Sequence, residues 1–150
     1  AFDMIRNDPK LFYVGAVQTL FEAAMNVFIL QWPPALNKAV AAAFGGDANT
    51  PFGTIFSCFM SCSLLGSILF GQLNKKKVVS EDATAIMLSV ATVAMAGAAI
   101  STRMSPVPFS GIVAAFFVYE ACVGMYFPAM GTLRSRLVPD SHKSLILSVF

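Results

Sequence analysis

Residues 51–74, PFGTIFSCFMSCSLLGSILFGQLN, contain no charged side chain, and residues 83–102 form a second charge-free stretch. A helix needs about 20 predominantly apolar residues to cross the hydrocarbon core of a bilayer. A helix of a soluble protein normally keeps a polar face over such a length. Both stretches therefore predict membrane-spanning helices. The composition agrees, since 12% of the residues are charged, against about 25% in an average globular domain.

The same pattern recurs on both sides of these stretches. The apolar residues 11–32 precede them, and we expect Pro33 and Pro34 to end that helix because proline disrupts a helix interior. Residues 109–133 follow, and after a polar loop the run SLILSVF resembles the first turns of one more helix. The predicted fold is an all-α membrane protein with spans at about 11–32, 52–73, 83–102 and 109–133, and the start of another at 144–150.

The basic residues fall almost entirely on alternate loops of this arrangement. One side of the membrane receives eight of them, and the other receives only Lys38 and Arg103. Because cytoplasmic loops are enriched in lysine and arginine, the N-terminus and the loops 74–82 and 134–143 are expected in the cytoplasm of a multi-pass protein of the cell membrane. The eight residues are Arg6, Lys10, Lys75, Lys76, Lys77, Arg134, Arg136 and Lys143.

The first span carries a polar stripe. Gln18, Glu22 and Asn26 are four residues apart, and each such step turns only about 40° around a helix. An ionisable group at membrane depth costs about 2.5–3.5 kcal/mol on insertion scales, so it is expected to face a cavity or polar groups of a neighbouring helix. We favour a cavity for Glu22.

The fourth span carries one acid, Glu120, followed at four-residue steps by Gly124 and Pro128. The small residue allows close helix packing and the proline predicts a bend. Glu120 could face a cavity, or accept a hydrogen bond from a serine or tyrosine across a packed interface. In the second span, Gly66 belongs to small residues repeated every four positions, which predicts a closely packed helix.

Other functional classes find little support in the sequence. Cys58 and Cys62 share a helix face, but a metal site needs further ligands and the only histidine, His142, lies in a distant loop. We expect no metal and no cofactor. No phosphate-binding G-x-x-x-x-G-K-[ST] run occurs, and no nucleophile and base pair is expected at membrane depth. We therefore expect neither an enzyme nor a nucleic-acid partner.

Several motifs resemble those of the molybdate-anion transporter family of the major facilitator superfamily. Residues 18–22 (QTLFE) and 32–36 (WPPAL) resemble its seventh helix, and residues 54–60 (TIFSCFM) with 65–67 (LGS) its eighth. Residues 120–128 (EACVGMYFP), followed by Arg134-Ser135-Arg136 and Pro139, are similar to its tenth helix and the next loop. The chain departs from the family pattern at Asn26, Pro33 and His142-Lys143.

This resemblance implies that the spans are helices seven to ten, and the start of helix eleven, of a twelve-helix secondary transporter. We then expect the chain to be part of the C-terminal half of the transporter. Its expected partners are the N-terminal half, the lipid bilayer and the oxyanion molybdate. Glu22 would carry a coupling proton, and Gln18, Asn26 and Trp32 would line the cavity, Trp32 as part of a gate. The alternatives are a carrier of another solute, such as a sugar or organic acid, and a non-transporting receptor or scaffold on the same fold.

Overall fold

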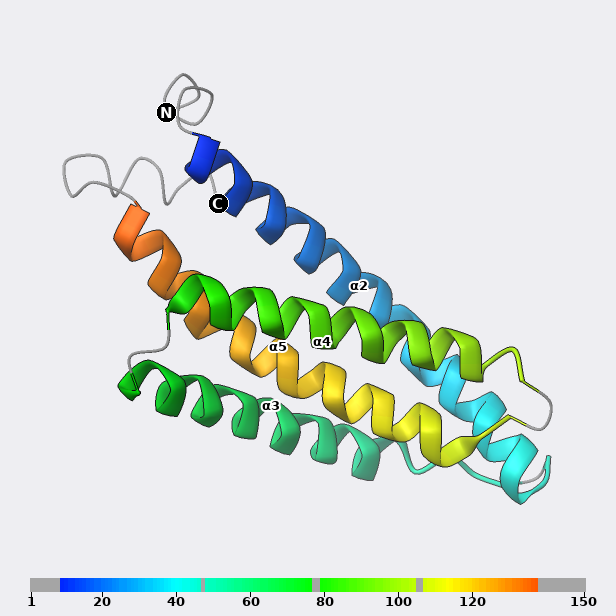
Figure 1. Ribbon diagram of the computed structural model, residues 1–150. Helices are drawn as coiled ribbons and strands as arrows, with labels where there is room; N and C mark the ends of the chain where they lie inside the picture. The colour runs from blue at the N-terminus through cyan, green and yellow to red at the C-terminus, as the bar shows by residue number, and fades with distance from the viewer. Residues whose placement is uncertain (1–8, 47, 77–78, 105–106, 138–150) are drawn as a thin grey trace.

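A computed structural model describes residues 9–46, 48–76, 79–104 and 107–137 of the chain. These residues form four helices and no strand (Figure 1): α2 (Pro9–Phe44), α3 (Phe52–Lys75), α4 (Ser80–Ser101) and α5 (Phe109–Leu137). All four are long and apolar enough to cross a bilayer. The predicted all-α membrane fold is confirmed, and the run 144–150, expected to begin a further helix, lies outside the described residues.

The expectation that Pro33 and Pro34 end the first helix was wrong. Helix α2 contains both prolines and continues to Phe44. The residues that follow them are mostly alanine, leucine and lysine, which favour helix, and neighbouring structure can compensate for the backbone groups that a proline frees within a membrane helix. The helix ends instead before Gly45, whose φ of 99° suits glycine, and whose amide donates to the carbonyl of Ala41 at 3.1 Å.

Helix α5 is the common partner of the other three helices. Consecutive helices run in opposite directions, so α3 is parallel to α5 while α2 and α4 run the other way (Figure 1). Helices α2, α3 and α4 all pack against α5. Within the most apolar window of each helix, 50% of the residues are buried in α5, against 11% in α3. The core is therefore built around α5.

Helices α3 and α5 touch at the level of their backbones. A Cβ atom added to Gly66 would overlap the backbone carbonyl of Ala121, and one added to Gly124 would overlap that of Ser63. Close approach of this kind suits a membrane, where lipid is as apolar as the side chains and helix association depends on packing and hydrogen bonds. The two glycines therefore allow the backbones of the parallel pair α3 and α5 to come into contact.

The outward faces of the helices are apolar. Large hydrophobic side chains on all four helices are exposed, among them Leu20, Leu30, Leu65, Val93 and Phe127. Soluble monomers rarely expose large apolar side chains over so much of their surface. These faces suit contact with lipid, which agrees with a multi-pass membrane protein.

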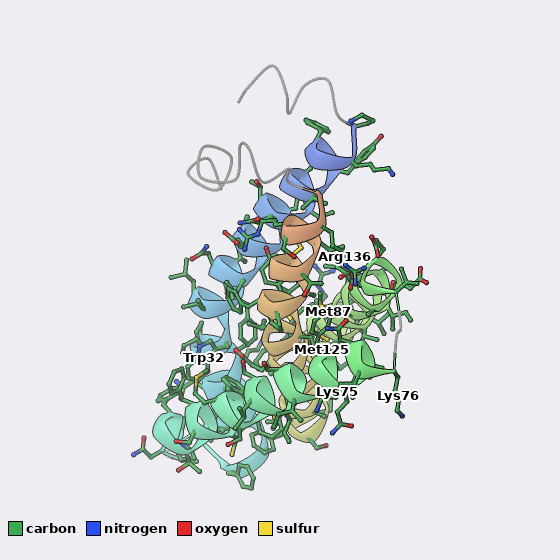
Figure 2. The ribbon with its side chains drawn as sticks, turned by 90° about the vertical axis from the view of Figure 1, so that its left-hand side faces the viewer. Trp32, Lys75, Lys76, Met87, Met125 and Arg136 are labelled. Atoms are coloured by element: carbon green, nitrogen blue, oxygen red, sulfur yellow. The ribbon has the colours of Figure 1, made fainter. Side chains whose placement is uncertain are left out.

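The structure gathers basic residues at one end of the bundle. Lys10 lies in the first turn of α2, Lys75 is the last residue of α3 and Lys76 follows it, and Arg134 and Arg136 lie in the last turn of α5. All are at the same end of the bundle (Figures 1 and 2). Arg136 lies 4.0 Å from the Glu81 carboxylate at the start of α4. The basic residues of the other side of the predicted topology, Lys38 and Arg103, lie toward the opposite end. Arg6, Lys77 and Lys143 lie outside the described residues.

We expect Gly124→Ala to destabilise the protein by about 1–3 kcal/mol, because the new methyl group meets backbone that cannot move aside. Gly131→Ala in the same helix is the matched control. Its Cβ enters open space, and alanine is favoured over glycine within a helix by about 0.5–1 kcal/mol. Melting temperatures of the purified protein in detergent should move in opposite directions for the two variants. Equal melting temperatures would contradict the close packing at Gly124.

Candidate functional site

A hydrogen bond within the bundle joins the polar stripe of α2 to α5. The hydroxyl of Tyr126, on α5, donates to Glu22 Oε1 at 3.2 Å and also lies 3.4 Å from the main-chain carbonyl oxygen of Gln18. Tyr126 is 1% exposed, and Glu22 is half-buried. The structure thus places the predicted residues Gln18 and Glu22 at one site and adds Tyr126 to them.

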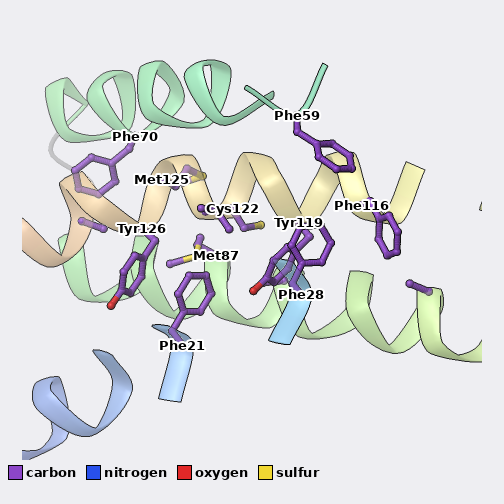
Figure 3. Close-up of a cluster of buried hydrophobic side chains, with 14 of the residues drawn as sticks. Phe21, Phe28, Phe59, Phe70, Met87, Phe116, Tyr119, Cys122, Met125 and Tyr126 are labelled. Atoms are coloured by element: carbon purple, nitrogen blue, oxygen red, sulfur yellow. The ribbon is translucent and has the colours of Figure 1, made fainter. Parts of the chain in front are cut away.

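Aromatic rings surround this hydrogen bond. Phe21 of α2 stacks on Tyr126, with 4.3 Å between ring centroids, and also faces Tyr119 at 6.2 Å. Phe28, two turns further along α2, packs on Tyr119 at 4.7 Å. Figure 3 shows these rings between α2 and α5, close to Met87 of α4. They hold α2 against α5 and keep the polar groups in surroundings of low polarity.

Two polar atoms at this contact have unused hydrogen-bonding capacity. Gln18 is 6% exposed and its Oε1 atom is buried with no hydrogen-bond partner in the described part of the chain. The same holds for the hydroxyl of Tyr119, which is 3% exposed. A buried polar atom left without a partner costs about 1–3 kcal/mol. Native structures keep few such atoms, so these two call for an explanation.

The other predicted members of the stripe lie elsewhere. Asn26 is exposed, and its Nδ2 donates to the main-chain carbonyl of Glu22 at 2.8 Å rather than to another helix. Trp32 is half-buried and packs edge-on against Phe52 and Phe59 of α3, at 5.8 and 5.2 Å between centroids. Trp32 therefore lies at an α2–α3 contact, towards the opposite end of the bundle from Lys10.

Glu120 does not join Glu22. It precedes Gly124 by one helical turn and so shares the face of α5 that packs on α3. Glu120 is 8% exposed, and no hydrogen bond to its carboxylate occurs among the described residues. The expected serine or tyrosine donor is thus not found in this part of the chain. Pro128, four residues beyond Gly124, cannot donate to the Gly124 carbonyl.

A groove of about 460 Å³ opens between α2 and α4. Met130 and Leu133 of α5 are among the residues that line it, as are Lys10 and Glu81, which belong to the basic end of the bundle. The rest of the lining is mainly apolar, and none of the predicted site residues contributes to it. The groove is therefore separate from the Glu22–Tyr126 contact.

Sequence reasoning missed Tyr126, Tyr119 and Phe21. A signal existed, because Tyr119 and Tyr126 are seven residues apart and so share one face of an apolar helix. A buried tyrosine hydroxyl usually has a hydrogen-bond partner. Pairing that face of α5 with the stripe of α2 required knowing which helices are neighbours, which no local pattern reveals.

The fold, with its four apolar helices in alternating direction, is that of a multi-pass membrane protein. A family model described as sugar transporters with 12 transmembrane helices, one of the major facilitator families, matches residues 1–126. The chain belongs to this major facilitator family. No solved structure matches the chain significantly.

Curated relatives of the chain carry the name molybdate-anion transporter. The relative from Xenopus tropicalis is 32% identical over 146 residues, which cover 95% of this chain and 30% of the relative. Those from Takifugu rubripes and Danio rerio are each 27% identical, and each match covers 96% of this chain and 28% of the relative. The chain thus spans about 30% of the length of the curated relatives it matches.

Proposed function

We propose that the protein to which this chain belongs is a secondary transporter that takes up molybdate. The observation that carries this proposal is the match over about 95% of the chain to relatives named molybdate-anion transporters. Transport by such bundles requires polar groups at membrane depth in contact between helices. The Glu22–Tyr126 pair meets this requirement.

Molybdate is a tetrahedral dianion, so its site needs positive charge or convergent hydrogen-bond donors. Between Lys10 and Lys38, helix α2 has only one charged side chain, that of Glu22, and an ionised Glu22 would repel the anion. The proposal therefore assigns Glu22 the coupling proton, so that it is neutral when the anion is bound. The principal anion ligands belong to parts of the transporter outside the described helices.

Asn26 and Trp32 remain candidates for the cavity wall and gate, and Glu120 is a candidate for a second polar position.

The basic end of the bundle is proposed to face the cytoplasm of the cell membrane. The support is the concentration of lysine and arginine at that end, which is the strongest general determinant of orientation. This placement puts the loops 74–82 and 134–143 inside the cell and Arg103 outside.

Uptake of radiolabelled molybdate by cells expressing the full-length protein tests the proposed substrate. We expect saturable uptake that excess unlabelled molybdate abolishes and that sugars and organic acids leave unchanged. Competition by a sugar instead would support the alternative of a sugar carrier on the same fold. No uptake of any solute by protein that reaches the surface would support the receptor or scaffold alternative.

Replacing Glu22 with glutamine should separate proton coupling from anion exchange. Glutamine keeps the size and the polar character of the side chain but cannot gain or lose a proton. We expect Glu22→Gln to abolish uptake driven by a pH gradient while exchange of labelled for unlabelled molybdate continues. Glu120→Gln provides the comparison at the other buried acid. Normal pH dependence of uptake in Glu22→Gln would contradict the assignment of the coupling proton to Glu22.

Cysteine labelling from outside the cell tests the orientation. In a cysteine-free background of the full-length protein, we expect Arg103→Cys to react with a membrane-impermeant maleimide on intact cells. Lys76→Cys should react only after the cells are permeabilised, because lysines of the basic end face inward. The reverse pattern would invert the topology.

A further inference from the structure

The buried Oε1 atom of Gln18, one helical turn from Glu22, receives no hydrogen bond from the described residues. In the structure, the single hydroxyl proton of Tyr126 serves Glu22 Oε1 and faces the main-chain oxygen of Gln18. None of these contacts reaches Gln18 Oε1, which is buried and has no partner among the residues that the structure describes. An amide oxygen accepts hydrogen bonds and cannot donate them, so only an added donor would satisfy it.

Glu22 is the group placed to supply this donor. It lies four residues after Gln18 on the same face of α2, and side chains with this spacing are neighbours on a helix. An ionised carboxylate offers only acceptors, whereas a protonated carboxyl group carries one O–H donor. A proton on Glu22 would therefore supply the missing donor, and the second carboxyl oxygen could still accept from Tyr126.

We infer that Gln18 accepts a hydrogen bond from the protonated carboxyl of Glu22, and that Tyr126 is a positioning residue which favours the ionised form. This inference rests on the proposed role of Glu22 as carrier of the coupling proton. The proton passes from hydronium to a Glu22 oxygen and returns to water, with no change of oxidation state. The two partners act in opposite directions. Gln18 stabilises the neutral, protonated carboxyl group that forms when Glu22 binds the proton, and Tyr126 stabilises the carboxylate that remains after the proton is released.

Few other charged groups face this site. On α5, Tyr126 contacts Glu22 directly, Tyr119 lies on the same face, and Arg134 is the first basic residue beyond them. On α3, the side chains that meet α2 include the aromatic rings of Phe52 and Phe59. Across the groove, α4 contributes Glu81, at the level of Lys10 near the basic end. Among the described residues, Tyr126 is therefore the one titratable group on a neighbouring helix that is hydrogen-bonded to Glu22.

The test is an infrared pH titration of the purified full-length protein in lipid. The signal is the C=O stretching band of protonated carboxyl groups, and the contribution of Glu22 is the part lost in Glu22→Gln. We expect Gln18→Met, which keeps the side-chain length but removes the acceptor, to lower the pH of half-protonation by about one unit. Tyr126→Phe should raise it by about one unit, because a carboxylate loses a charge-assisted donor while the ring can still stack on Phe21.

Tyr119→Phe is the matched control. It removes another buried hydroxyl from the same face of α5, and that hydroxyl has no partner within the described residues. We expect no change in the pH of half-protonation. Melting temperatures of all variants identify any that misfold. Gln18→Asn, with a shorter amide side chain, is a second test at position 18. We expect it to lower the pH of half-protonation by less than Gln18→Met does.

The possible failures are distinguishable. An upward shift or no shift in folded Gln18→Met overturns the inference, as does a shift of the same sign in Gln18→Met and Tyr126→Phe. If Glu22→Gln shows the same titrating bands as the unchanged protein, Glu22 does not carry the proton, and the inference loses its basis. Opposite shifts in a protein that takes up no molybdate would support the proton site and contradict only the proposed substrate.

Discussion

The close contact between α3 and α5 is the constraint on which the rest of the bundle depends. Lipid offers no hydrophobic drive for helix association, so two membrane helices stay together through backbone proximity, side-chain packing and hydrogen bonds. Gly66 and Gly124 remove the side chains that would separate the two backbones. With α3 seated on one face, α5 offers its remaining faces to α2 and α4. A central helix results, flanked by three helices whose outer faces can meet lipid.

Helix α2 is attached to α5 in a different way, and this difference explains where the polar site lies. Aromatic rings rather than glycines mediate the contact, with Phe21 and Phe28 lying against Tyr126 and Tyr119. Large rings hold the backbones further apart than glycines do, which leaves room for the side chains of Gln18 and Glu22. In surroundings of low polarity, each hydrogen bond there matters more, and so does each polar atom that lacks a partner.

Glu22 of α2 and Glu120 of α5 occupy contrasting environments. Glu120 shares the closely packed face of α5 with Gly124, whereas Glu22 meets a tyrosine hydroxyl at the looser contact. A carboxyl group that must gain and lose a proton needs partners for both forms. Tyr126 donates to Glu22, and Gln18 is the acceptor that we propose for its protonated form. No hydrogen bond to the Glu120 carboxylate occurs among the described residues. This contrast makes Glu22 the stronger candidate for coupling.

The sequence by itself determined the helices and the grouping of basic residues, because charge-free length and the placement of lysine and arginine are local properties. It also placed Gln18 and Glu22 on one face. It misjudged Pro33 and Pro34, since the helix-forming residues beyond them and the packing of Leu36 and Ala39 outweigh the local break. Only the tertiary structure decided that Tyr126 meets Glu22, that Asn26 bonds to its own helix and that no described residue donates to Gln18 Oε1. These depend on which faces of α2 and α5 meet, and that is settled by packing between residues about a hundred positions apart in the chain.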